Sequence, residues 1–256
     1  MGNENDTLES NSTPASKNSL ILLIFLILLV LILIIVSIYL FRDHIPFQSE
    51  TSQEISLIRD NIDSCVNSVL IDGARLVGLQ GGYVSLPDNS FKTDFSSIAY
   101  GSYLGQNVLL SESSMEKEIG SYIENTLTIC FDKENFADFN ISYENPRASV
   151  SIHDSSISAT VIFSLTVLKQ DSKYVLNKKY SAEVPIRLGG IRSAAEDIIN
   201  EGINNPQYIP ISSLLNQEYD ISILPYSNET LVYVLTDSQS KINNASYVFR
   251  FASRIK

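Results

Sequence analysis

The pattern of hydrophobic and polar positions divides this chain into a polar tail, one long apolar run and a large region of shorter patterns. The run from Leu20 to Phe41 contains no charged residue, glycine or proline. At about 1.5 Å of rise per residue it would form a helix of roughly 33 Å, enough to cross a bilayer core of about 30 Å. It is longer than the apolar core of a signal peptide, and no small-residue cleavage site follows it. We therefore predict a retained transmembrane helix over residues 20–41.

The flanks of this run bear on its direction in the membrane. Residues 1–19 are polar and aperiodic, which is typical of a disordered tail. Lys17 and Arg42 stand on opposite sides of the run, so flanking charge hardly separates the two orientations. All folding signals lie behind the run. We therefore expect a single-pass protein of the cell membrane, with its N-terminus inside and its C-terminal domain outside.

The region behind the run is expected to form one exported domain. We place a linker at residues 42–53 and the domain at 54–256, with a possible subdivision near residue 135. Three stretches of this region repeat apolar residues at helical spacing. Each is expected to form one helix: residues 54–77, 114–130 and 191–203.

Two further details of these helices can be predicted. Ser113 is followed three residues later by Glu116, which matches a capping box, so we expect Ser113 to be the N-cap of the second helix. A short helical piece is expected around residues 210–217.

The hydrophobic period changes to two in the second half of the chain, which predicts strands. The clearest strand is 157–167; a partner at 149–152 precedes it and a strand at 174–188 follows it. The turns between them are too short for crossover connections, so the three should form an antiparallel meander.

A second block of three strands is expected near the C-terminus. The expected strands are residues 220–224, 230–236 and 246–255, with turns at 225–228 and 240–244. Blocks of strands separated by helices predict an α+β fold, with two amphipathic helices, the meander, a helix and this second antiparallel block.

The segment between the first two helices is the least regular. Three glycines within residues 78–82 mark a tight connection, and residues 83–86 are expected to form a short strand. Residues 88–114 are rich in Gly, Ser and Tyr, and we interpret them as an excursion loop whose short apolar patches allow for one hairpin. Such long irregular segments often carry binding sites.

Three tyrosines in or beside this excursion, Tyr83, Tyr100 and Tyr103, are candidates for a binding surface. Tyrosine together with Ser, Gly and Asn is the composition of adaptable binding surfaces. The alternative is that they are ordinary strand and loop tyrosines.

The chain has two cysteines, Cys65 and Cys130, each on the apolar face of an expected helix. In an exported domain an even pair favours a disulfide, whereas in a reducing compartment both would be buried free thiols. Packing the two helices together would bring the cysteines near each other. Neither cysteine has the spacing of a zinc or thioredoxin motif.

The formal net charge of −11 disfavours nucleic acid as a partner, because an acidic domain repels phosphate. Sequons at Asn140, Asn228 and Asn244 fall in the expected exported domain. We expect some of them to be glycosylated if the source organism modifies exported proteins.

Catalytic signatures are weak. His153 and Asp154 stand beside serines, but adjacent residues of one turn cannot converge as a catalytic triad. Gly189–Gly190 precedes an expected helix without the Lys-Ser/Thr of a phosphate-binding loop, so we interpret it as a turn. No cofactor or metal is predicted.

Glutamates of the second helix give no acid–base pair. Glu118 and Glu124 do not share a helix face. We interpret them, with Glu116, as a solvated surface.

Several segments carry a family resemblance. They are LVGLQGGYVSLP, MEKEIGSYIENTLTIC, and DISILPYSN with the following TLVYVLTDSQSKINNASYVFRFASR. In this order behind one N-terminal span, from Asn61 onward, they resemble uncharacterised single-span exported membrane proteins of small-genome (DPANN-type) archaea. The resemblance implies an archaeal envelope setting and no catalytic residues.

These observations favour a non-enzymatic cell-envelope protein, whose exported domain binds another protein or a surface polysaccharide. One alternative is a pilin-like filament subunit, although no prepilin cleavage site precedes Leu20. Another is a membrane-tethered hydrolase, whose catalytic constellation only the fold could assemble. The oligomeric state does not follow from the sequence.

Overall fold

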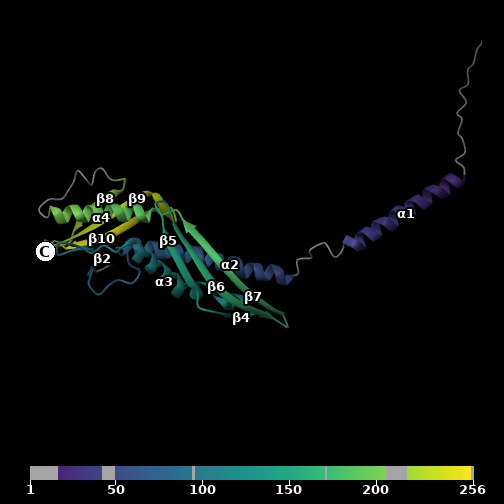
Figure 1. Ribbon diagram of the computed structural model, residues 1–256, viewed down its shortest axis with the longest axis horizontal. Coiled ribbons are helices and arrows are strands. Elements are labelled where there is room, and N and C mark those ends of the chain that lie inside the picture. The colour runs from purple at the N-terminus through teal and green to yellow at the C-terminus, as the bar shows by residue number, and fades with distance from the viewer. Residues whose placement is uncertain (1–16, 42–49, 94–95, 171, 206–217, 255–256) are drawn as a thin grey trace, which may run out of the picture. The chain divides into compact units, whose positions relative to one another are not determined.

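The structure, a computed structural model, describes residues 17–41, 50–93, 96–170, 172–205 and 218–254 (Figure 1). The chain divides into two compact units, Met1–Glu54 and Ile55–Lys256. The expected linker around 42–49 and the expected helical piece at 210–217 lie outside the described residues.

The first unit contains helix α1 (Lys17–Phe41), which includes the apolar run. Among the residues described in full, no helix reaches the length and apolarity that a membrane crossing requires.

Two long helices open the second unit. Helix α2 (Glu50–Leu79) begins just before the unit boundary, and α3 (Glu112–Cys130) follows later in the chain. They pack where Gly73 of α2 leaves room for Ile119 and Tyr122 of α3. Cys65 and Cys130 form a disulfide, with 5.7 Å between their Cα atoms. The predicted pairing of the two cysteines is confirmed.

The prediction that Ser113 is the N-cap of α3 is wrong. The cap is Ser111, whose side chain accepts a hydrogen bond from the Ser114 N–H. The Glu116 carboxylate does not reach back to the helix start, because it accepts a hydrogen bond from the Ile152 N–H instead.

A four-stranded sheet contains the predicted meander. Its strands are β4 (Asn140–Tyr143), β5 (Arg147–Ile152), β6 (Ile157–Lys169) and β7 (Ser172–Val184). Strand β6 is central, with β7 along one side and β5 and β4 end to end along the other. Residues 144–146 separate β4 from β5, and Pro146 cannot donate to a ladder. Strand β7 stops at Val184 rather than 188, because Pro185 follows it.

The two faces of this sheet differ in burial. One face of β6 is fully buried in the core shared with α2 and α3, and includes Val161, Phe163 and Leu165. The opposite face is open, and Ile162 is 48% exposed there. The alternation in the sequence therefore predicted both faces correctly.

The second sheet has six strands. They are β1 (Ser90–Lys92), β2 (Ser97–Tyr103), β3 (Gln106–Asn107), β8 (Asp220–Pro225), β9 (Thr230–Ile242) and β10 (Ala245–Arg254). The order is β1-β2-β10-β9-β8, with β3 paired to β2. All neighbours are antiparallel except β2 and β10, which run parallel.

The excursion at 88–114 is therefore not a loop: it supplies β1, β2 and β3. Its pairing partner β10 lies far along the chain, so the local pattern could not reveal it. The short strand expected at 83–86 does not form. Strand β9 continues into the expected turn at 240–244 as far as Ile242, and the chain reverses at Asn243 and Asn244, both with positive φ.

Helix α4 (Leu188–Asn204) covers one face of the six-stranded sheet (Figure 1). A side chain at Gly101 of β2 would lie 2.8 Å from both Ile199 of α4 and Phe251 of β10, so glycine permits this close approach. Gly189 and Gly190 lie inside the first turn of α4 rather than before it. The fold is α+β, as predicted, and the core runs through both sheets.

Candidate functional site

Aromatic side chains gather on the six-stranded sheet, on the face opposite α4. Phe91 of β1 lies with its ring centroid 6.4 Å from Tyr100 and 5.2 Å from Tyr226, which follows β8. Tyr100 lies 5.0 Å from Tyr103. We call Phe91, Tyr100, Tyr103 and Tyr226 the aromatic patch.

The patch rests on a small apolar cluster that is separate from the main core. Its buried members are Ile98, Val232 and Ala252, and Phe91 and Tyr100 pack against them. Because side chains alternate along a strand, Gly101 faces α4 while its neighbour Tyr100 faces the other way. Tyr226 is 52% exposed, and Phe91, Tyr100 and Tyr103 are half-buried, so the patch is partly open to solvent.

One edge of the patch carries charge. The guanidinium carbon of Arg254 lies 5.8 Å from the centroid of the Tyr103 ring, a cation–π contact. The same guanidinium lies 3.2 Å from Glu229, and the two side chains are 38% and 59% exposed. Exposed aromatic rings with a polar rim are the usual composition of an interaction surface.

Of the tyrosines that the sequence singled out, Tyr100 and Tyr103 belong to the patch and Tyr83 does not. Tyr83 lies on the connection after α2, where burial and the nearby Glu118 carboxylate raise its pKa. Phe91 and Tyr226 were missed. Phe91 reaches Tyr100 through the local pairing of β1 with β2, whereas Tyr226 lies near Phe91 only because strands distant in sequence assemble in one sheet.

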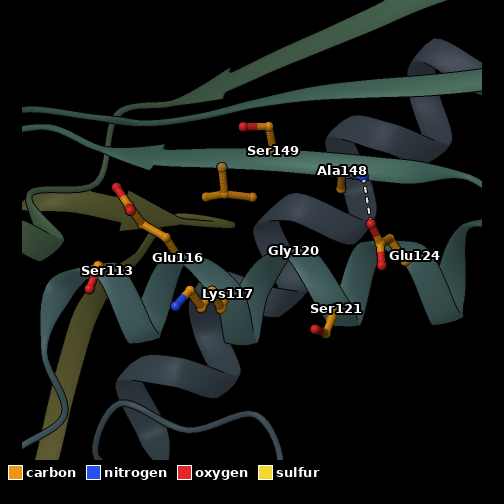
Figure 2. A pocket seen from close by; sticks show the side chains of 9 residues that line it. Ser113, Glu116, Lys117, Gly120, Ser121, Glu124, Ala148 and Ser149 are labelled. Atoms are coloured by element: carbon orange, nitrogen blue, oxygen red, sulfur yellow. Dashed lines mark hydrogen bonds between the residues drawn. The ribbon is translucent and has the colours of Figure 1, made fainter.

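A second feature is a groove between α3 and β5 (Figure 2). The Glu124 carboxylate accepts the Ala148 N–H at 2.9 Å, and Glu116 accepts the Ile152 N–H at 2.9 Å. Gly120 lies between these glutamates and faces the strand, and the cavity left there measures about 310 Å³.

The expectation that Glu116, Glu118 and Glu124 form a solvated surface is wrong. Glu118 also accepts backbone hydrogen bonds, from the N–H groups of Val84 and Ser85. An edge strand with open N–H groups invites pairing with another chain, and a covered edge does not. The carboxylates of Glu116 and Glu124 therefore cover the edge of β5.

A buried ion pair lies where β7 leads into α4. Arg187 donates two hydrogen bonds to the fully buried Asp237 of β9, at 3.0 and 2.7 Å, and Ser240 donates a third at 2.6 Å. Burial alone would raise the pKa of Asp237, but the hydrogen bonds from Arg187, Ser240 and the Gln239 N–H hold it below its ordinary value. These contacts join the last strands to the start of α4.

The remaining candidates lie apart from the patch. Nε2 of His153 lies 3.1 Å from Oγ of Ser158 at an exposed turn. The sequon asparagines Asn140, Asn228 and Asn244 are exposed. Within the described residues, no group of three His, Cys, Asp or Glu side chains could hold a metal ion.

Comparison with protein-family models, with curated proteins and with solved structures gave no significant match.

Proposed function

We propose that this protein is a membrane-anchored binding protein of the cell envelope. The apolar run from Leu20 to Phe41 is its single-pass anchor, with the N-terminus inside. The α+β unit from Ile55 onward lies outside and binds an envelope protein or a surface polysaccharide through the aromatic patch. The protein performs no catalysis in this proposal.

The disulfide supports an exported domain. Cys65 and Cys130 are bonded, and disulfides persist in oxidising compartments outside the cytosol. The three exposed sequons are compatible with the same location. For the anchor, the support is the composition of the run itself, which lacks any charge.

The aromatic patch is the single observation that carries the binding proposal. Contiguous aromatic side chains that remain partly open to solvent on a folded domain mark interaction sites, whereas scattered ones need no explanation; Tyr226 is exposed, and the other three members are half-buried. Patch members come from β1, β2 and the turn after β8, so a rigid sheet presents them. Rigid aromatic anchors on such a scaffold dominate many interfaces.

The test measures how much native envelope material the full-length protein retains when it is immobilised in detergent micelles. The double substitution Tyr100→Ser/Tyr226→Ser is expected to lower the affinity for the retained component roughly tenfold or more, since each removes an aromatic anchor. Ile129→Ser is the matched control, because Ile129 is 76% exposed on α3, outside the patch.

The binding proposal is wrong if the double variant keeps the wild-type affinity while remaining folded. It is equally wrong if Ile129→Ser weakens retention as much as the patch variant does. Unfolding midpoints of all three proteins establish that the fold is intact.

A further inference from the structure

The open face of the four-stranded sheet carries an ordered array of hydroxyl and amide side chains. Successive outward positions of β6 lie about 7 Å apart, and each has a neighbour on β7. Thr166 lies between Ser142 of β4 and Val175 of β7, and Ser164 lies opposite Asn177. The Ser164 hydroxyl donates to the Asn177 side-chain oxygen at 2.5 Å.

A pocket of about 350 Å³ opens at these positions. It lies beside residues 144–146, where β4 has ended and β5 has not begun, so the sheet lacks a full third strand there. Its polar lining residues are Ser142, Glu144, Ser164, Thr166 and Asn177. This volume is at the small end of the range of about 300–1,000 Å³ that small-molecule sites span.

Cations stand on both sides of this pocket along the strands. One step beyond Asn177 on β7 is Lys179, which lies across Ile162 from Arg147 of β5. One step beyond Val175 in the other direction is Lys173, opposite Leu168. All three cations are exposed. The chain as a whole has a formal net charge of −11, so this face departs from the rest of the molecule.

We propose that this pocket, flanked by Lys173, Lys179 and Arg147, binds an acidic saccharide, a sugar chain that carries carboxylate groups. The hydroxyl and amide side chains exchange hydrogen bonds with sugar hydroxyls, and the cations pair with the carboxylates. Exposed Ile162 and Val175, 48% and 58% accessible, provide apolar contact for the C–H face of a sugar ring.

The charges on this face also argue against other anionic partners. Glu144 in the pocket and Glu183 on β7 lie on the same sheet as the three cations. Nucleic acid and anionic bilayers need a larger excess of positive charge than three cations beside two glutamates supply. A saccharide with spaced carboxylates needs only cations spaced along the strand, and the glutamate accepts hydrogen bonds from its hydroxyls.

This site lies on a different sheet from the aromatic patch, so the inference goes beyond the proposed function and can fail independently of it. The experiment titrates full-length protein in detergent with a galacturonate oligosaccharide and, in parallel, with the uncharged galactose oligosaccharide of equal length. We expect binding of the acidic sugar that weakens as salt is raised from about 50 to 300 mM. We expect markedly weaker binding of the neutral one.

Two variants locate the site. Lys173→Gln/Lys179→Gln should weaken binding of the acidic sugar roughly tenfold, through loss of charge-assisted hydrogen bonds. Asn177→Leu should reduce it to a similar extent without changing charge, because a side chain of nearly the same size replaces the amide that lines the pocket. Lys241→Gln is the control, since Lys241 is an exposed lysine on β9 of the other sheet.

Several results would overturn the proposal. They are no binding of the acidic sugar by folded wild-type protein, equal binding of the neutral sugar, and an unchanged affinity in the Lys173→Gln/Lys179→Gln variant. Stronger, lysine-dependent binding to phosphatidylglycerol vesicles than to the sugar would reassign the face to lipid headgroups. The Tyr100→Ser/Tyr226→Ser protein should bind the acidic sugar as tightly as wild type does, and weaker binding by this variant would contradict a separate site.

Discussion

Asp237 shows how one buried charge holds distant parts of the chain together. Its side chain is fully buried, while its partner Arg187 is 19% exposed and also contacts Glu218. A buried carboxylate is tolerable only when donors surround it, and Arg187, Ser240 and the Gln239 N–H do so here. Without Asp237, the largely buried Arg187 keeps only the exposed Glu218 as its charged partner.

We predict that Asp237→Asn lowers the free energy of unfolding by about 3 kcal/mol at pH 7, the low end for a broken buried pair. The pKa of Asp237 is lower in the folded protein than its ordinary value near 3.8. Its contribution is therefore fully present above about pH 4 and is lost as the pH falls through the folded pKa.

Urea unfolding at several pH values checks this prediction. The difference between wild type and Asp237→Asn should shrink in acid. Glu229→Gln is the control, because Glu229 is 59% exposed in a surface pair and should change stability by less than about 1 kcal/mol. A difference that stays constant down to pH 2 would contradict the assigned role.

Helix α2 contacts strand β10 at Gly78. The Tyr247 hydroxyl donates to the Ala74 carbonyl at 2.9 Å, and Arg250 donates to the Leu79 carbonyl at 3.1 and 2.8 Å. A Cβ at position 78 would lie 2.4 Å from the Val248 carbonyl oxygen. The close approach of helix and strand therefore requires glycine.

We predict that Gly78→Ala destabilises the protein by about 2–3 kcal/mol, because backbone atoms must shift. Gly120→Ala is the matched substitution in α3, where the new methyl group would make an ordinary contact 3.7 Å from the Ala148 carbonyl oxygen. It should be neutral or stabilise by up to about 1 kcal/mol through helix propensity. Thermal unfolding of both variants measures the two changes in stability. Similar losses of stability in the two variants would contradict the close packing at Gly78.

At the scale of elements, the disulfide joins α2 to α3 across a sequence separation of 65 residues. Chain-entropy arguments assign such a loop a stabilisation of about 4 kcal/mol. We predict a loss of this size for Cys65→Ala/Cys130→Ala, measured by denaturant unfolding. Adding reductant should destabilise wild type and leave the variant unchanged. Equal sensitivity of both proteins to reductant would contradict a structural bond.

The elements also show which features the sequence could predict. Helices α2 and α3 and the meander follow from periodicity, because each buries one face on a single core. Strand β2 was missed because its Gly, Ser and Tyr residues show little alternation, and its parallel partner β10 is distant in sequence. The roles of Glu116, Glu118 and Glu124 were missed because their partners are backbone N–H groups of other elements.

The binding residues also divide into those that the sequence could predict and those that only the fold reveals. Tyr100 and Tyr103 could be selected from composition, since Tyr-rich polar segments often bind. Phe91 and Tyr226 join them only after β1, β2 and β8 are assembled in one sheet. The sequence also could not group the cations around the pocket of the four-stranded sheet, because only strand register aligns Arg147 with Lys179.

At the scale of the whole molecule, the proposal assigns different tasks to the two units. The unit Met1–Glu54 contains the apolar run, and Ile55–Lys256 contains both sheets and the disulfide. In the proposed function the second unit is held outside the cell and contacts its partner through the aromatic patch.

The most direct test places a photo-cross-linking amino acid at position 226 of the full-length protein in intact cells. Position 129, also exposed but on α3, is the control. We predict a discrete cross-linked product from position 226 only, which protease added outside the cells degrades. Products that external protease cannot reach, or equal cross-linking from position 129, would contradict the account.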